Sequence, residues 1–102
     1  MKKKERIISK IKRIVEEWGN FSTADVECES SPVIASIGKD THQLCENVYT
    51  DGVNATTYVH DRNVNEEFIF YEDLKIDVLE DILAIAENYA VDMQKSMERC
   101  KD

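Results

Sequence analysis

The sequence predicts an α+β fold in which an antiparallel sheet of three to five strands is covered on one face by an amino-terminal and a carboxyl-terminal helix. Three observations predict it: an amphipathic pattern at each end of the chain, and alternating, β-branched segments between about Ala24 and Tyr71. Each helix has one apolar stripe and the sheet has one apolar face, so two layers bury all three. Because 102 residues suit one domain, we expect a single domain spanning residues 1–102.

The first helix is expected from Lys3 to Trp18. Its apolar residues recur at steps of three and four, which places them on one side of a helix. They are Ile7, Ile8, Ile11, Ile14, Val15 and Trp18. Gly19 follows directly and can take the left-handed conformation that ends a helix.

The segment between Phe21 and Gly52 fits two interpretations. The first is a set of strands, Ala24–Glu29, Val33–Ile37 and Leu44–Tyr49, with a turn at Ser30–Pro32. The second is a helix from Pro32 to Val48, which would complete the element order of a winged helix, a DNA-binding architecture. We prefer strands, because Gly38 would cost about 1 kcal/mol in the middle of that helix.

The remaining elements follow clear local signals. Thr50-Asp51-Gly52 indicates a tight turn, because Asp-Gly supplies positive φ angles. The elements expected after it are a strand at Val53–His60, a turn at Asp61–Asn65, a strand at Phe68–Tyr71 and a long amphipathic helix over about Asp77–Cys100. At the start of that helix, Asp77 and Glu80 would form a capping box.

These patterns also predict the residues of the hydrophobic core, because each element turns one apolar side inward. The predicted core is Ile7, Ile11, Ile14, Val15, Trp18, Val26, Val33, Ile37, Leu44, Val48, Val53, Val59, Phe68, Phe70, Val78, Ile82, Ile85, Ala86 and Tyr89.

The charge is unevenly distributed along the chain. Residues 1–13 hold seven Lys or Arg and one Glu, about +6, so residues 14–102 carry about −14 of the total of −8. An acidic body repels nucleic acid phosphate, so we do not expect nucleic acid as a partner. The basic run is expected to lie near the acidic carboxyl-terminal helix and partly neutralise it.

The cysteines and the amino-terminal residues indicate the cellular compartment expected for the protein. Three cysteines without a framework pattern argue against a secreted, disulfide-stabilised domain and favour the cytoplasm. The charged amino end is followed by no apolar run, so we expect neither a signal peptide nor a membrane span.

One motif partly fits a calcium-binding loop. Asp61, Asn63, Asn65 and Glu72 fall at positions 1, 3, 5 and 12 of that template. Position 6 requires a glycine for a sharp turn, and the chain has Glu66 there. A polar hairpin turn is therefore the preferred interpretation.

A zinc site or a catalytic dyad would have to be built from residues far apart in the sequence. His42 and Cys45 are three residues apart, but Cys28 and His60 are each more than a dozen residues away. Cys28 and Cys45 are better explained as small buried apolar residues. We therefore predict no catalytic, cofactor-binding or metal-binding residues, no cofactor, and a protein that is not an enzyme.

Several short stretches resemble small acidic uncharacterised proteins of gut anaerobic bacteria, over most of residues 22–89. The stretches are Ser30-Ser31-Pro32, Ser36-Ile37-Gly38, Thr57 to Asp61, Tyr71 to Leu74 and Asp77 to Glu80. The resemblance implies one compact domain, but it does not imply any particular activity and transfers no site residues.

Two functions remain from different classes. The first is a cytoplasmic protein-interaction or accessory module whose acidic surface binds a basic protein partner. The second is a winged-helix-type nucleic-acid-binding regulator, suggested by element order and the basic run Lys2–Arg13. Met93, Met97 and Cys100 extend the last helix beyond a small sheet, so we expect a monomer or a homodimer through that helix.

Overall fold

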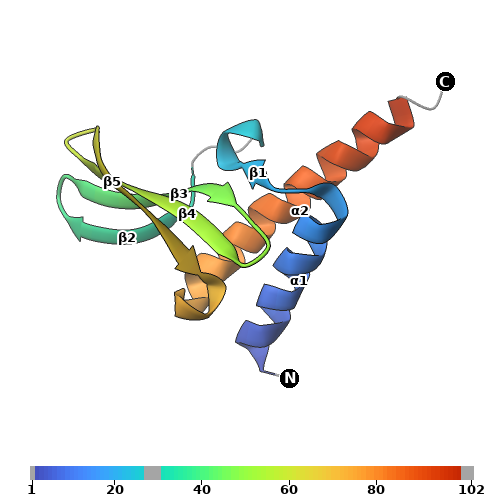
Figure 1. Cartoon of the computed structure of the whole chain (residues 1–102), viewed down its shortest axis with the longest axis horizontal. Coiled ribbons are helices and arrows are strands. Elements are labelled where there is room, and N and C mark those ends of the chain that lie inside the picture. Colours follow the sequence, from blue (N-terminus) through green and yellow to red (C-terminus); the bar gives the residue numbers. More distant parts are fainter. Residues whose placement is uncertain (1, 27–30, 100–102) are drawn as a thin grey trace.

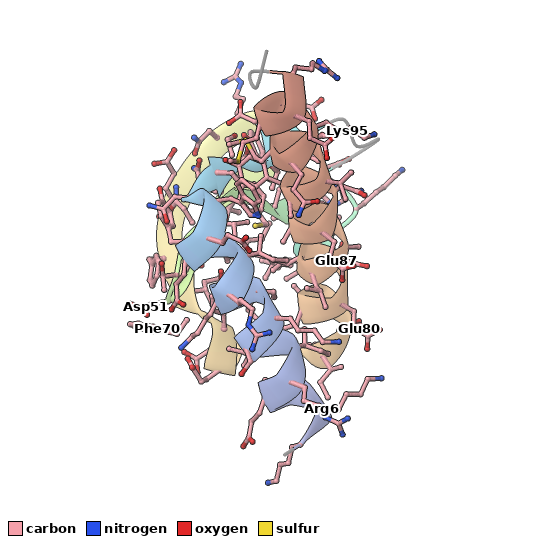
Figure 2. All side chains as sticks on the ribbon, turned by 90° about the vertical axis from the view of Figure 1, so that its right-hand side faces the viewer. Arg6, Asp51, Phe70, Glu80, Glu87 and Lys95 are labelled. Carbon is pink, nitrogen blue, oxygen red and sulfur yellow. The ribbon has the colours of Figure 1, made fainter. Side chains whose placement is uncertain are left out.

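The computed structural model describes residues 2–26 and 31–99, and it has two layers (Figure 1). Helices α1 (Lys3–Trp18) and α2 (Ile76–Arg99) form one layer, and a five-stranded antiparallel sheet forms the other. Figure 2 shows both helices in front of the sheet, on the same side of it. The predicted fold class is confirmed.

The sheet is built around its two central strands. Its strands are β1 (Phe21–Ser22), β2 (Val33–Gly38), β3 (Thr41–Val48), β4 (Gly52–Val59) and β5 (Arg62–Phe70). They lie in the order β1-β3-β4-β5, and β2 pairs with the same edge of β3 as β1. There are two short 3-10 helices in the described chain. Helix η1 (Thr23–Asp25) follows β1, and helix η2 (Tyr71–Asp73) lies between β5 and α2. Among the described residues β5 pairs only with β4, so it is an edge strand along its whole length.

Helix α1 has the predicted bounds, and Gly19 directly follows it. Gly19 adopts a positive φ of 92°, which favours glycine, but its ψ of 170° differs from the predicted left-handed helical conformation. Its N–H donates to the Val15 carbonyl at 2.7 Å, which satisfies one carbonyl of the last turn. Helix α2 extends beyond the sheet at its carboxyl end (Figure 1). Met97 is exposed there, and a homodimer through this helix stays a prediction.

The hydrophobic core lies between the helices and the sheet. Its members are Ile7, Ile8, Ile11, Val15, Phe21, Val26, Cys45, Val48, Val53, Tyr71, Leu74, Val78, Leu79, Ile82, Ile85 and Ala86. Tyr71 is the largest fully buried side chain among them. Cys45 is also fully buried, so its predicted role as a small apolar residue is confirmed, whereas Cys28 lies outside the described residues.

Four predicted core residues are exposed instead. The exposed fractions are 45% for Val33, 70% for Ile37, 46% for Phe68 and 54% for Phe70. Val33, Phe68 and Phe70 belong to the sheet face that the helices do not cover. They pair with Leu44, Asn54 and Gly52, whose chain neighbours Cys45 and Val53 face the core. Ile37 lies at a register shift between Ser36 and Gly38, near the end of the β2–β3 hairpin.

The predicted strand at residues 24–29 is wrong at its start. Ser22 caps the 3-10 helix η1, because its hydroxyl accepts from the Ala24 N–H at 3.2 Å and its own N–H donates to the Asp25 carboxylate. Residues 27–30, which hold the rest of that strand and the start of the predicted turn at 30–32, lie outside the described residues.

The predicted turn at residues 61–65 is also wrong, because β5 already begins at Arg62. The chain reverses at His60 and Asp61, which both have positive φ, 50° and 64°. Two such residues between paired strands match the twist of a tight hairpin. Asn63 and Asn65, although frequent in turns, pair with β4 as strand residues.

Two smaller predictions about turns and caps need correction. Gly52 is not among the positive-φ residues, so the turn at 50–52 does not need it for its backbone conformation. Helix α2 begins at Ile76, and the Leu79 N–H donates to the Lys75 carbonyl at 3.0 Å. Asp77 therefore lies inside the helix, where it accepts from the Val78 N–H, and it does not form the predicted capping box.

The winged-helix alternative is wrong. It requires one helix over residues 32–48, and this segment instead forms strands β2 and β3, which pair antiparallel. The basic helix α1 lies beside α2, and Lys3 forms an ion pair with Glu80 at 3.2 Å. The predicted placement of the basic run near the acidic last helix is confirmed by this contact.

Because Cys45 is buried, we expect the stability of the folded protein to fall at alkaline pH. Burial, followed by the nearby charge of Glu46, raises the pKa of the Cys45 thiol from 9.0 to about 12. Between pH 9 and pH 12 the thiol ionises only in the unfolded state. The contribution of the protonated Cys45 thiol to the stability of the folded state is therefore complete below pH 9 and is lost as the pH rises toward 12. Relative to Cys45→Ala, the intact protein should lose stability with a slope approaching about 1.4 kcal/mol per pH unit above pH 9. Urea unfolding at several pH values measures it, and parallel pH profiles for the two proteins would contradict it.

Candidate interaction surface

The sheet has one face that points away from α1 and α2, which we call the open face. Side chains alternate along a strand, so the neighbours of the core residues Cys45 and Val53 point away from the helices. By strand register and side-chain contacts, the open face carries Val33, His42, Leu44, Glu46, Tyr49, Asn54, Thr56, Tyr58, Glu66, Phe68 and Phe70. Antiparallel sheets commonly have one face packed on the core and one polar face in contact with solvent. The open face of this sheet is not purely polar.

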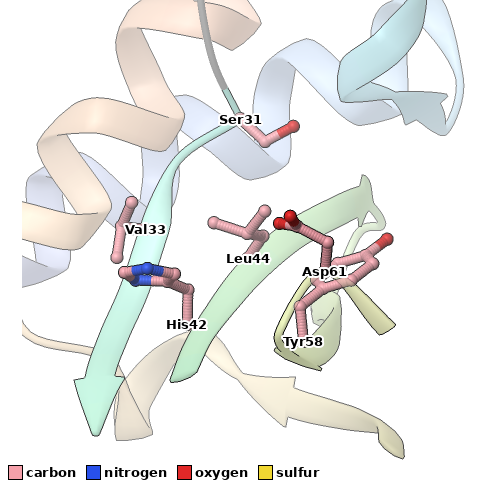
Figure 3. A pocket seen from close by; sticks show the side chains of 6 residues that line it. All are labelled: Ser31, Val33, His42, Leu44, Tyr58 and Asp61. Carbon is pink, nitrogen blue, oxygen red and sulfur yellow. The ribbon is translucent and has the colours of Figure 1, made fainter. Parts of the chain in front are cut away.

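One end of the open face holds a shallow hollow of about 440 Å³. It is lined by Ser31, Val33, His42, Leu44, Tyr58 and Asp61. In Figure 3, Leu44 lies between Val33 and His42 on one side and Tyr58 and Asp61 on the other. The floor of the hollow is therefore apolar, and its rim carries one imidazole and one carboxylate.

Two carboxylates lie next to this hollow. The Tyr58 hydroxyl donates to the Glu46 carboxylate at 2.9 Å. This hydrogen bond is the main cause that raises the pKa of Tyr58, followed by burial and by the charges of Glu46 and Glu66. Glu66 accepts from the Asn63 amide at 3.2 Å, and Asn63 pairs with Tyr58, so both carboxylates lie near Tyr58. Apart from Arg62, which pairs with Val59 at the end of the hairpin, strands β3, β4 and β5 contain no lysine or arginine.

An aromatic cluster, formed by the partly exposed Tyr49 and the exposed Phe68 and Phe70, occupies the other end of the open face. The Phe68 ring lies 6.1 Å from Tyr49 and 5.2 Å from Phe70, measured between ring centroids. The rings are tilted or perpendicular, the arrangements that aromatic pairs prefer. Phe70 lies near Asp51, because the Tyr71 N–H donates to the Asp51 carbonyl, and both are labelled side by side in Figure 2. A further carboxylate therefore lies close to the cluster.

The calcium template does not form a loop. Asp61 is in the β4–β5 turn, and Asn63 and Asn65 lie along strand β5, followed by Glu72 in η2. Ligands spaced along an extended strand do not converge on one cation as those of a tight loop do. In the part of the chain that the structure describes, no three His, Cys, Asp or Glu side chains gather as a metal site.

The residues considered for zinc or nucleophilic chemistry are separated. Cys45 faces the helices and is fully buried, whereas His42 is exposed on the open face. His60 lies in the β4–β5 turn, 3.6 Å from the Asp40 carboxylate. The raised pKa of Cys45 also keeps its thiol protonated, and the thiolate is the form that attacks or binds metal.

The sequence contained a signal for the open face that the core prediction did not use. Residues 66–70 alternate Glu66, Phe68 and Phe70 on one side with Glu67 and Ile69 on the other. A strand with apolar side chains on both sides predicts two apolar surfaces. Only one of these, through Ile69, packs on the core.

Comparison with protein-family models, curated proteins and solved structures found no match. The resemblance to small acidic uncharacterised bacterial proteins therefore stays a prediction. Neither α1 nor the described part of α2 is long and apolar enough to cross a membrane.

Proposed function

We propose that this protein is a cytoplasmic interaction module that binds a basic segment of a partner protein on its open face. One observation carries the proposal: Phe68 and Phe70 are about half exposed on the same face as Glu46 and Glu66. Clustered exposed aromatic side chains are typical of contact surfaces, and the carboxylates favour a partner of positive charge. The role proposed is binding and not catalysis.

Two cations of α1 contact other parts of the molecule. Lys3 pairs with Glu80, and the Lys4 ammonium donates to the Glu72 carbonyl at 2.7 Å. Both contacts lie within the molecule, between α1 and the segment that contains η2 and α2. Two of the seven Lys and Arg of residues 2–13 are therefore engaged in contacts within the molecule.

The proposal predicts a specific salt and charge dependence. A fluorescein-labelled amphipathic peptide rich in lysine and arginine should bind, and its Kd should rise about tenfold between 50 and 300 mM NaCl because salt screens the charges. The double variant Glu46→Gln/Glu66→Gln should bind it at least fivefold more weakly. Fluorescence anisotropy measures both effects.

The control removes two charges of the same sign from the helical side of the molecule. Glu87 and Glu98 are exposed on α2, so Glu87→Gln/Glu98→Gln changes the net charge equally without touching the open face. It should alter the Kd by less than twofold. Equal losses in the two double variants, or a Kd that does not respond to salt, would contradict the proposed binding surface.

A further inference from the structure

We infer that the segment bound by the open face is an amphipathic helix with two apolar side chains two turns apart and a lysine or arginine between them. This inference rests on the proposed function and specifies its partner. It follows from the arrangement of groups on the face, where two apolar regions have carboxylates beside the line that joins them. Glu46 follows Leu44 by two residues on β3, and Glu66 precedes Phe68 by two residues on β5. The two carboxylates therefore flank the line that joins Leu44 and Phe68 across β4.

The spacing of the two apolar regions sets the spacing in the ligand. Leu44 is opposite Thr56, and Phe68 is opposite Asn54, so the two residues are two strands apart and offset by two positions. With about 4.8 Å between strands and about 3.3 Å per residue along them, their Cα atoms are roughly 12 Å apart. Two turns of an α-helix advance about 11 Å. Apolar residues at positions i and i+7 of a helix therefore reach both regions.

The backbone of the ligand decides between a helix and an extended strand. An extended segment with apolar residues at i and i+4 would span a similar distance, about 13 Å. Lying across the rings of Phe68 and Tyr58, however, it would leave its N–H and C=O groups facing apolar atoms. A helix satisfies these groups internally, so it is the form that can cross the face.

The carboxylates fix what lies between the two apolar residues. A side chain at i+3 or i+4 lies on the same helix face, one turn from each apolar residue. At that place it would meet Glu46 and Glu66, and no lysine or arginine of β3, β4 or residues 64–70 competes with it. A cation there gains charge-assisted hydrogen bonds, and it can also lie over the exposed ring of Phe68.

The test uses two labelled peptides of identical composition. The first places leucine at i and i+7 and arginine at i+3 and i+4 on one helical face, and the second reorders the same residues so that apolar and basic positions alternate as in a strand. The helical peptide should bind the full-length protein at least tenfold more tightly. Its amide chemical-shift changes in the ¹⁵N-labelled protein should fall on residues facing the open side of β3, β4 and β5.

A pair of exposed apolar residues supplies the matched variants. Phe70→Ala should weaken binding of the helical peptide about tenfold, because exposed aromatic anchors carry much of the affinity of such surfaces. Val91→Ala removes a similarly exposed apolar side chain, 46% accessible, from α2. It should leave the Kd within twofold. Circular dichroism on both variants checks that the fold is intact.

The outcomes separate this inference from the proposed function. Equal binding of both peptides, sensitive to Glu46→Gln/Glu66→Gln, would overturn the helical ligand and leave a basic partner in place. Tighter binding of the alternating peptide, with shift changes confined to the free edge of β5, would replace the helix with strand addition. If neither peptide binds, the inference and the proposed function both fail.

Discussion

Replacing Tyr71 with alanine is expected to lower the free energy of unfolding by about 3 to 5 kcal/mol, the usual cost of removing a large buried aromatic ring. Tyr71 is fully buried where η2 leads from the sheet into α2. Its N–H donates to the Asp51 carbonyl and its carbonyl accepts from the Leu74 N–H. The loss would be a large part of the roughly 5 to 15 kcal/mol that stabilises a domain of this size.

The hydroxyl of Tyr71 contributes separately from its ring. It donates to the Tyr49 carbonyl, so Tyr71→Phe leaves that carbonyl without this partner and should cost about 1 to 3 kcal/mol. Tyr89→Phe is the matched control, because the Tyr89 hydroxyl donates to the Trp18 carbonyl over 3.4 Å from a partly exposed position. Urea unfolding should give a smaller loss for it, below about 1 kcal/mol. Equal losses in the two variants would show that the Tyr71 hydroxyl has no special role.

The helices could be predicted from the sequence because their determinants are local. The apolar residues of α1 repeat within the segment itself, and Gly19 ends it through its own φ angle. For α2, the long stripe from Val78 to Ala86 was equally clear. The predicted start at Asp77 is one residue late, because Asp is a favoured cap residue near the start of a helix.

The strand boundaries were harder because pairing overrides local preference. Asn63 and Asn65 favour turns, yet both lie in β5 opposite residues of β4. The true turn residues, His60 and Asp61, adopt positive φ without the glycine that usually indicates such a turn. A register shift between Thr57 and Tyr58 further displaced the pairing from simple alternation.

The negative charge of the candidate interaction surface can be predicted from the sequence, but its position on the sheet cannot. The excess of carboxylates on the body could be counted, and it suggested a basic partner. Alternation also grouped Phe68 with Phe70, but it does not state which of the two sheet faces the helices cover. That choice depends on contacts between residues far apart in the sequence. For this reason alternation alone predicts a core position for these two aromatic residues, although both are exposed on the open face.

Replacing Gly52 with alanine is expected to cost about 3 kcal/mol of stability, although the change adds only one methyl group. A Cβ atom at Gly52 would lie 2.9 Å from a ring carbon of Phe68 and closer still to the Ile69 carbonyl oxygen. The ring can move, but the carbonyl belongs to the backbone of β5, which pairs with β4 at this position. The strands must therefore shift apart, a form of overpacking that commonly costs about 1 to 3 kcal/mol.

Gly38→Ala is the control for this second prediction, because a Cβ atom at Gly38 would meet no atom within 4 Å. Gly38 is also in a strand and has no positive φ, so alanine should change the stability by no more than about 0.5 kcal/mol. Thermal unfolding of both variants measures the difference. Because the methyl group at position 52 also displaces the Phe68 ring, Gly52→Ala should weaken binding of the basic helical peptide, whereas Gly38→Ala should not. A stable Gly52→Ala protein with unchanged peptide affinity would mean that Phe68 does not need the space above this glycine, and that the aromatic cluster is not held in place by it.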